Sequence, residues 1–469
     1  MSTYDDGLSR RRFLQRTGQA TLAVGSLGLL NAYNPFTEDA QAAILEEARS
    51  YAGRTVTLRA IQPIAATNKT VQGLAYQEVY NRFMRANPSI QVQFEYSPWA
   101  NFTQALSVAI GGGNAPDVAT WIDDQRIPQL AATGFLVALD DLIKADKLNV
   151  ASQIDPLALA SHRYKGKLYG LPYYYDARAL YYNKTMLSQA GVKTLPRTWD
   201  EADRLGRQLD VKDSSGRYTR LGYVPLSPST IGSSVAGPGG NSFLFIYGWQ
   251  NGGEFANADL TKVTVNDPAI VDALTWCVKV SDEVGGAVEQ GAFALRATRG
   301  GTVDPFSLDA MAMMTQPLNF GHSAVDAQKA PVKWGVTQAP YHTRPATWSG
   351  VLSAALPVGG KHQAAAWELA KFMISPEIQT YLANTLRFIP TRKSLWGEIP
   401  LMKTDPEMAL SVQILPTTHI RPPIPNSQQL WDEILRASDN ALYHRMTPKA
   451  ALDAANATIQ QGLDRYLKS

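Results

Sequence analysis

The order of three segments near position 56 constrains the fold of this chain more than any other feature. An apolar strand begins at Val56, and segment 74–86 then carries apolar residues at helical spacing until Asn87 and Pro88 end it. Segment 90–96 follows with apolar and polar residues in alternation, which is typical of a half-buried strand. A strand, a helix and a second strand in this order form the unit from which parallel sheets are built. The pattern therefore predicts an α/β fold with a parallel sheet.

The same mixture of periodicities continues along the rest of the chain. Segment 116–121 is predicted to be a further strand, and segment 364–374 has the apolar face of a helix. Thr447 and Pro448 are typical of a helix N-cap and of the first helical position, so they predict a last helix. Because 469 residues exceed what a single hydrophobic core usually supports, the length predicts two domains.

Segment 164–184 gathers tyrosines around two charged residues. Gly166 lies in a Lys-Gly-Lys sequence and can adopt the positive φ of a tight turn, and strand-forming residues follow it. Asp176 and Arg178 then lie among tyrosines, and burying either charge alone is costly, so each needs a partner or a ligand. Two interpretations are open from these residues alone. One is a structural ion pair inside a sheet, and the other is a sugar site whose rings stack on the ligand while polar groups bond its hydroxyls.

Charge and composition argue against several other classes of function. The net charge is +3, and no dense block of Lys and Arg follows the N-terminus, so we expect no nucleic-acid partner. The single cysteine, Cys277, lies in an apolar segment that predicts burial, and it excludes an intrachain disulfide. The six histidines are scattered and none has metal-ligand spacing. The sequence therefore predicts neither a metal site nor a cofactor.

Residues 1–42 are predicted to be an export signal. Segment 9–15, Ser-Arg-Arg-Arg-Phe-Leu-Gln, resembles the twin-arginine signature of bacterial export, and the mildly apolar segment 20–30 follows it. The sequence Ala-Gln-Ala ends at position 42 and offers a cleavage site, which places the expected mature start near Ala43. The alternative is a basic amphipathic tail that stays on the protein. The signal predicts a soluble periplasmic protein that is exported by the twin-arginine route.

Four groups of motifs, taken in order, resemble one family. The chain resembles the extracellular solute-binding proteins of ABC importers, in particular the carbohydrate-binding group that includes maltose- and trehalose-type receptors. Each motif alone is weak, but together they span the expected mature chain. The matching segments are Gly-Asn-Ala-Pro-Asp-Val at 113–118 with 134–141, the tyrosine-rich segment 164–184 with 195–201, the Gly-Gly turn of 245–255, and 348–352 with 364–372 and 389–392.

The resemblance implies a two-lobe periplasmic-binding-protein fold of the α/β class, with a hinge and a ligand cleft between the lobes. It places the N-terminal lobe at 43–174 plus 350–404 and the C-terminal lobe at 175–349 plus 405–469. The implied partners are a small carbohydrate ligand and the membrane permease subunits of an ABC transporter, and the protein is expected to be a monomer. A hinge of a few residues and a cleft that closes on a polar ligand suit this function.

The resemblance also implies a set of ligand-binding residues. Trp121 and Asp124 match a sugar-facing tryptophan and an acidic acceptor of hydroxyl groups, and Asp176 matches the acidic position of the hinge. Many maltose-type receptors carry another tryptophan where segment 312–320 has none, so Gln316 becomes a candidate and maltose itself is not implied. The full set of expected ligand-binding residues is Trp121, Asp124, Tyr174, Asp176, Arg178, Asn241, Phe243, Gln316, Trp348, Gly350 and Trp431.

Two alternatives to a sugar receptor are open. The same fold could bind a non-sugar solute such as a glycerophosphodiester or a polyamine, but Asp124, Asp176 and Arg178 among many rings favour a neutral polyol. A periplasmic glycosidase would need two carboxylates that face each other across the scissile bond, and Asp124 with Asp176 is the candidate pair. None of the common catalytic or nucleotide-binding motifs occurs, so the sequence predicts a receptor rather than an enzyme.

Overall fold

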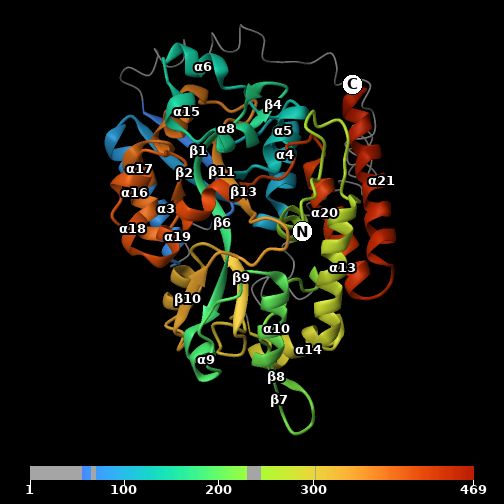
Figure 1. Ribbon diagram of the computed structural model, residues 1–469. Coiled ribbons are helices and arrows are strands. Elements are labelled where there is room, and N and C mark those ends of the chain that lie inside the picture. Colours follow the sequence, from blue (N-terminus) through green and yellow to red (C-terminus); the bar gives the residue numbers. More distant parts are fainter. Residues whose placement is uncertain (1–54, 65–69, 230–243, 302, 469) are drawn as a thin grey trace, which may run out of the picture.

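The computed structural model describes residues 55–64, 70–229, 244–301 and 303–468. The predicted export signal at 1–42 and the expected mature start at Ala43 lie outside these ranges. Within them, helices and strands alternate along the chain and form one large sheet, two small two-stranded sheets and the helices that pack around them (Figure 1).

The main sheet of the described residues has nine strands, and its central path has the order β10-β6-β11-β3-β1-β2. β1 pairs in parallel with β2 and with β3, whereas β11 runs antiparallel to both β3 and β6. The strands of this sheet are β1 (Val56–Gln62), β2 (Ile90–Tyr96), β3 (Val118–Asp123), β6 (Leu171–Asn183), β9 (Met313–Pro317), β10 (Trp334–Thr337), β11 (Thr347–Ala355), β12 (Ile389–Pro390) and β13 (Thr418–His419). The short strands outside it are β4 (Arg163–Tyr164), β5 (Lys167–Leu168), β7 (Val211–Lys212) and β8 (Tyr218–Arg220).

The predicted strand, helix and strand at the start of the described chain are confirmed. Helix α3 (Val71–Ala86) joins β1 to β2, which pair in parallel. The hydroxyl of Thr70 accepts a hydrogen bond from the backbone N–H of Gly73 at 3.0 Å and caps the first turn. Asn87 ends the helix, where its backbone N–H still donates to the carbonyl of Phe83. The predicted last helix is also confirmed as α21 (Pro448–Leu467), with Thr447 as its N-cap.

β6 is formed by the tyrosine-rich segment and runs lengthwise through the middle of the molecule (Figure 1). Its first half pairs with β11 as far as Ala177, and its second half pairs with β9 from Arg178 onwards. The predicted turn lies just before it, because Gly166 connects β4 to β5 with a φ of +81°. The partner of β6 therefore changes between two residues near its centre.

The described residues form two large hydrophobic cores. The first core holds the buried side chains of β1, α3, α15 and α16, and the second core holds those of α12, α13, α20 and α21. The helices around the first core are α3, α4 (Phe102–Gly111), α5 (Arg126–Ala132), α6 (Asp140–Ala145), α7 (Val150–Gln153), α8 (Pro156–Ser161), α15 (Gln363–Met373), α16 (Pro376–Leu386), α17 (Leu395–Glu398), α18 (Leu401–Thr404) and α19 (Pro406–Ile414). The remaining helices are α9 (Lys184–Gln189), α10 (Trp199–Leu209), α12 (Leu244–Gln250), α13 (Pro268–Glu283), α14 (Gly286–Thr298), α20 (Ser427–Leu442) and α21.

β6 and β11 each pass from one side of the molecule to the other. In β11, Trp348 packs in the second core, whereas Val351 packs in the first. In β6, Ala179 belongs to the first core, and Tyr181 belongs to a smaller cluster with residues of β9 and α14. The lobe boundaries expected at 174/175 and 349/350 fall inside these two strands.

The helices after position 405 divide between the two cores. α20 and α21 pack against each other and supply Leu430, Ile434 and Leu463 to the second core. α19, which the sequence groups with them, instead contributes Met408 and Ile414 to the first core. The chain therefore returns to the second core after α19 rather than before it.

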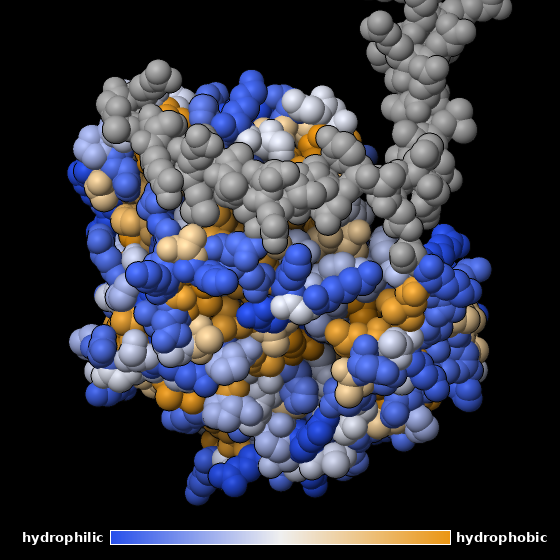
Figure 2. Space-filling view, turned by 90° about the horizontal axis from the view of Figure 1, so that it is seen from above, coloured by the Kyte–Doolittle hydropathy of each residue, from blue (hydrophilic) through white to orange (hydrophobic). Residues whose placement is uncertain are grey.

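The surface mixes polar and apolar residues. In the view from above, hydrophilic residues form most of the outline and hydrophobic residues gather across the middle of this face (Figure 2). Among the residues that the structure describes, no helix combines the length and the apolar character that crossing a membrane requires.

Candidate ligand-binding site

A cavity of about 850 Å³ lies where β6 and β11 pass between the two cores. Its walls come from β3, β6 and β11, from the region of α4 and α5, and from the segment that leads into α20. Its tryptophan rings are Trp99, Trp121, Trp348 and Trp431. Cavities of 300 to about 1,000 Å³ with convergent polar groups are typical of small-molecule sites, and this one lies toward the upper end of that range.

Trp121 is placed by an irregularity in the sheet. Ser353 pairs with Ile122 and the next residue pairs with Thr120, so Trp121 is the extra residue of a bulge. Its φ of +72° lies in the left-handed region, which is strained for a residue with a large side chain. The ring lies 5.8 Å from that of Tyr174, centroid to centroid, and the indole N–H has no hydrogen-bond partner among the described residues.

Asp176 and Arg178 form an ion pair that also lines the cavity. The carboxylate Oδ2 of Asp176 lies 3.0 Å from Nη2 of Arg178, and Nη1 of Arg178 donates to the backbone carbonyl of Asp176 at 3.1 Å. Burial raises the pKa of Asp176, and the positive charge of Arg178 counteracts this only in part. Oδ1 of Asp176 and Nε of Arg178 have no partner among the described residues. The ion pair of the first interpretation is therefore present, and it faces a cavity.

Two guanidinium groups lie close to the ring of Trp348. Cζ of Arg178 lies 3.6 Å from the centroid of the Trp348 ring, and Cζ of Arg421 lies 4.9 Å from it. Arg421 also lies 5.1 Å from the ring of Trp431. Trp348 is only 4% exposed, whereas Trp431 is half-buried at the cavity wall. Trp431 is therefore better placed than Trp348 to stack on a ligand.

Asp124 does not line the cavity, whereas its neighbour Asp123 does. Arg421 donates to both carboxylate oxygens of Asp124, at 2.9 and 3.3 Å, and the backbone N–H of Val351 donates to Oδ1 at 3.2 Å. The Asp124 side chain is 1% exposed. These contacts hold the Asp124 carboxylate against other groups of the protein and away from the cavity.

The other expected residues divide into three groups. Tyr174 and Gly350 line the cavity. Gln316 is buried in β9 away from it, although the next residue, Pro317, is part of the wall. Asn241 and Phe243 lie outside the described residues.

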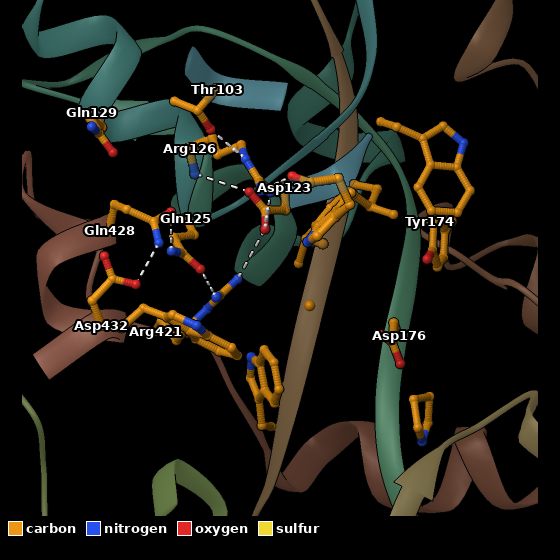
Figure 3. A pocket seen from close by; sticks show the side chains of 18 of the residues that line it. Thr103, Asp123, Gln125, Arg126, Gln129, Tyr174, Asp176, Arg421, Gln428 and Asp432 are labelled. Carbon is orange, nitrogen blue, oxygen red and sulfur yellow. Dashed lines mark hydrogen bonds and ion pairs between the residues drawn. The ribbon is translucent and has the colours of Figure 1, made fainter. Parts of the chain in front are cut away.

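Polar residues that the sequence analysis did not single out form the opposite wall. Figure 3 shows Asp176 on β6 across the cavity from Gln125, Arg421 and Gln428. Nε2 of Gln125 donates to Oε1 of Gln428 at 2.9 Å, and the guanidinium of Arg421 donates to Gln125. These bonds join the loop after β3 to the start of α20. The Asp-Asp-Gln-Arg sequence after a buried strand was the available signal, since polar residues at strand ends often face ligands.

The described residues contain no group of His, Cys, Asp and Glu side chains arranged to hold a metal ion. Cys277 is buried, as predicted, and burial raises the pKa of its thiol well above the usual value.

Known proteins share both sequence and fold with this chain. A family model described as "bacterial extracellular solute-binding protein" matches residues 66–380. The maltotriose-binding protein of Pyrococcus abyssi is 24% identical over 432 residues, which cover 90% of this chain and 82% of that protein. The diacetylchitobiose binding protein DasA of Streptomyces coelicolor is 25% identical over 367 residues, covering 75% and 76% of the two chains.

Solved structures show the same architecture. The GacH receptor of Streptomyces glaucescens, solved unliganded and with acarbose, superposes with a TM-score of 0.71 at 22% identity and covers 87% of this chain and 99% of its own. The maltose/maltodextrin-binding domain MalE of Bdellovibrio bacteriovorus, bound to maltotriose, gives a TM-score of 0.68 at 22% identity, with 87% and 100% coverage. The mixed α/β, two-lobe fold expected from the sequence is therefore confirmed.

Proposed function

Since the chain belongs to the bacterial extracellular solute-binding proteins, we propose that it captures an oligosaccharide or related polyol in the periplasm and delivers it to the permease of an ABC transporter. The observation that carries this proposal is the cavity between the two cores, where aromatic rings lie beside paired polar groups. Aromatic rings stack on the C–H faces of a sugar, and its hydroxyls need both donors and acceptors.

The charges around the cavity favour a neutral ligand. Each guanidinium group in its wall has a carboxylate within 3.0 Å: Arg126 with Asp123 at 2.9 Å, Arg178 with Asp176 at 3.0 Å, and Arg421 with Asp124 at 2.9 Å. A phosphodiester needs cations that are free to bind it, and a polyamine needs free carboxylates. Paired charges among rings therefore support a polyol over either alternative.

The position of Asp124 argues against a glycosidase. Two catalytic carboxylates must both reach the scissile bond. Asp124 is covered by Arg421 and does not line the cavity, and Asp123, which does, is held by Arg126 at 2.9 Å, so neither is a free carboxylate opposite Asp176. We therefore propose a receptor without catalytic activity.

The remaining parts of the proposal follow from the sequence. We propose that residues 1–42 direct export by the twin-arginine route, that the mature protein is a periplasmic monomer, and that β6 and β11 are the crossing segments between the two lobes. The ligand-binding residues that we propose are Trp121, Tyr174, Asp176, Arg178, Trp348, Gly350 and Trp431.

A sugar panel tests the proposal. The mature protein is mixed with malto-, manno-, galacto- and chitooligosaccharides and with their monosaccharides, while thermal midpoint and product formation are followed together. A ligand that binds only the native state stabilises it by about 2.7 kcal/mol at a concentration near 100 Kd. A rise in midpoint without product supports a receptor. Product would show an enzyme, and a response only to glycerophosphodiesters or polyamines would replace the sugar with one of those solutes.

A further inference from the structure

We propose that Glu407 forms a proton-sensitive joint on the side of β6 away from the cavity, and that loss of its proton favours closing of the cavity, so that ligand affinity rises with pH. Glu407 lies near the start of α19, is buried and does not line the cavity. The inference rests on the proposed function, because the two lobes must close on a ligand for the joint to affect binding.

Glu407 links the first core to the smaller cluster beyond it. The next residue, Met408, packs in the first core, whereas Tyr181 packs in the cluster with residues of β9 and α14. Oε1 of Glu407 accepts hydrogen bonds from the hydroxyl of Tyr181 and, at 2.7 Å, from the backbone N–H of Gly321. Oε2 accepts one from the backbone N–H of His322 at 3.3 Å. These three hydrogen bonds, called the Glu407 joint below, therefore connect the two clusters.

The Glu407 joint lies on the face of β6 that points away from the cavity. Successive side chains of a strand point to opposite faces. Asp176 and Arg178 line the cavity, and Tyr181 is three positions beyond Arg178 in a stretch that pairs with β9 without a shift of register. Ala179, which shares the face of Tyr181, packs in the first core. A rotation of the lobes that narrows the cavity on one face of β6 therefore widens the space on the face that holds the joint.

The backbone that donates to Glu407 is irregular and tightly packed. Asn319 has a φ of +147°, which is uncommon for a residue with a side chain, and Gly321–Asp326 forms a π-helix, a rare conformation that is frequent at functional sites. A Cβ at Gly321 would lie 2.5 Å from Cζ2 of Trp334, so the ring of Trp334 lies directly against this backbone. We therefore expect a rotation of the lobes to break the bonds to Glu407 rather than to deform this segment.

Burial decides which arrangement each protonation state favours. In the arrangement with the joint formed, burial raises the pKa of Glu407 from 4.5 to about 7, although its hydrogen-bond donors act in the opposite direction. Widening of the joint lets water reach the carboxylate and returns its pKa toward 4.5. A bound proton therefore favours the wider cavity, and the ionised acid favours the narrower one. Ligand binding and loss of the proton are consequently linked.

The charged groups around Glu407 do not neutralise it. Asp405, which caps α19, raises the pKa of Glu407 further, and Asp405 is itself paired with Arg387 at 2.6 Å. β10 also packs against α19 and carries no titratable side chain. Among the described residues Glu407 has no cationic partner, so its charge depends on access of water. The other titratable groups on the elements around it are Tyr181 of β6, His322 and Asp326 of the π-helix, Arg387 at the end of α16 and the exposed Lys403 of α18.

The test compares ligand affinity at two pH values. The mature protein, Glu407→Gln and Glu398→Gln are titrated calorimetrically with the malto-, manno-, galacto- and chitooligosaccharides of the sugar panel, at about pH 5.5 and about pH 8. Gln has the shape of the protonated acid and cannot titrate. Glu398 is the matched control, because it is exposed on α17, which also packs on the first core.

The ratio of the two Kd values, wild type against variant, is the quantity that decides. At about pH 8 we expect wild type to bind about tenfold more tightly than Glu407→Gln, and at about pH 5.5 the two should agree within about twofold. Glu398→Gln should follow wild type at both pH values. Titration of groups in the cavity, such as Asp176, affects wild type and variant alike and cancels in the ratio.

Tyr181→Phe is a second, independent variant, and it carries the test alone if Glu407→Gln does not fold. It keeps the ring and removes a hydroxyl whose hydrogen bond lowers the pKa of Glu407. The pH at which affinity changes should therefore move upward, whereas a merely structural role of Tyr181 would lower stability and leave that pH where it is. An unmoved midpoint would contradict the joint.

The outcomes separate this inference from the proposed function. If sugars bind but the ratio of Kd values is the same at both pH values, or if wild type loses affinity relative to Glu407→Gln as pH rises, the joint is wrong and the receptor remains. An effect of Glu398→Gln equal to that of Glu407→Gln would also overturn the joint, because the buried acid would then not be its source. If no sugar of the panel binds wild type at either pH, both proposals fall.

Discussion

Arg421 and Asp124 are 297 positions apart in the chain and form a buried ion pair in which the guanidinium donates to both carboxylate oxygens. The pair joins the end of β3 in the first core to the segment that precedes α20 in the second. Arg421 also lies over the rings of Trp348 and Trp431, so the same side chain positions two aromatic residues of the cavity.

We expect Arg421→Met to lower the free energy of unfolding by about 3 to 5 kcal/mol, because it leaves the charge of Asp124 buried without a partner. Urea denaturation measures the change. The double variant Asp124→Asn/Arg421→Met should lose less than the sum of the two single variants, since neither charge then remains alone. Lys449→Ala is the control, because its ion pair with Asp453 is exposed and should contribute less than about 1 kcal/mol. Additive losses would show that the pair does not act as a unit.

Asp176→Asn should weaken sugar binding. The carboxylate is costly to bury, as its raised pKa shows, and Asn keeps an acceptor for Arg178 while the cation–π contact with Trp348 remains. Trp431→Ala should also weaken binding, because it removes a half-buried ring from the wall. We expect losses of about tenfold or more in titrations, with a thermal midpoint close to wild type for Trp431→Ala and a lower one for Asp176→Asn, which leaves the buried charge of Arg178 without its carboxylate. Unaltered affinity in both variants would remove Asp176 and Trp431 from the site.

Gly350→Ala should fold normally but bind ligand less well. A Cβ at Gly350 would lie 3.7 Å from Nη1 of Arg178 and 3.7 Å from Oδ2 of Asp176, which is ordinary van der Waals contact, and it would take up space in the cavity wall. Gly222→Ala provides the contrast, because its Cβ would lie 2.0 Å from the carbonyl oxygen of Gly206 and should strongly destabilise the fold. Thermal unfolding and sugar titration distinguish the two effects. A destabilised Gly350→Ala with normal affinity would contradict the prediction.

Glu407 should make stability depend on pH. Its carboxylate is buried at the start of α19, where the hydroxyl of Tyr181 and the backbone N–H of Gly321 donate to it. Burial raises its pKa from 4.5 to about 7 even though these donors act in the opposite direction. The folded state therefore holds the proton more tightly than the unfolded state. The resulting stabilisation of the folded state is complete below about pH 4.5 and is lost as pH rises to about 7.

Glu407→Gln removes this titration. The free energy of unfolding of wild type, minus that of the variant, should fall by on the order of 3 kcal/mol between pH 4.5 and 7 and level off above pH 7. Urea denaturation at several pH values measures the difference. Parallel curves for the two proteins would show that Glu407 has an ordinary pKa in the folded state.

Local patterns predicted much of the fold. The helix end at Asn87, the cap at Thr447 and the turn at Gly166 are decided by the residues themselves and their close neighbours, and the structure confirms each of them. The ion pair between Asp176 and Arg178 was also predictable as one of two interpretations, because side chains two positions apart on a strand share a face. That the pair faces a cavity depends on elements distant in sequence.

The details of the site depend on contacts that are not local. The bulge at Trp121 arises where β3 meets β11, and an extra residue changes which of two adjacent carboxylates faces the cavity. The family resemblance indicated Asp124, whereas Asp123 lines the wall. Arg421 and Trp99 are brought to the cavity by segments without strong periodicity. Their positions at the cavity depend on how the two cores pack against each other, which local sequence patterns do not predict.

The continuous pairing of β6 limits how one core can move relative to the other. From Tyr174 to Asn183 every residue has a ladder partner, and the partner changes from β11 to β9 without a gap between Ala177 and Arg178. A rotation of one core against the other must therefore be shared as a small change of twist along the strand, because no unpaired pivot is available there. Under the proposed function, closing of the two lobes on a ligand would twist this continuously paired strand, and untwisting of the strand would favour reopening once the ligand leaves.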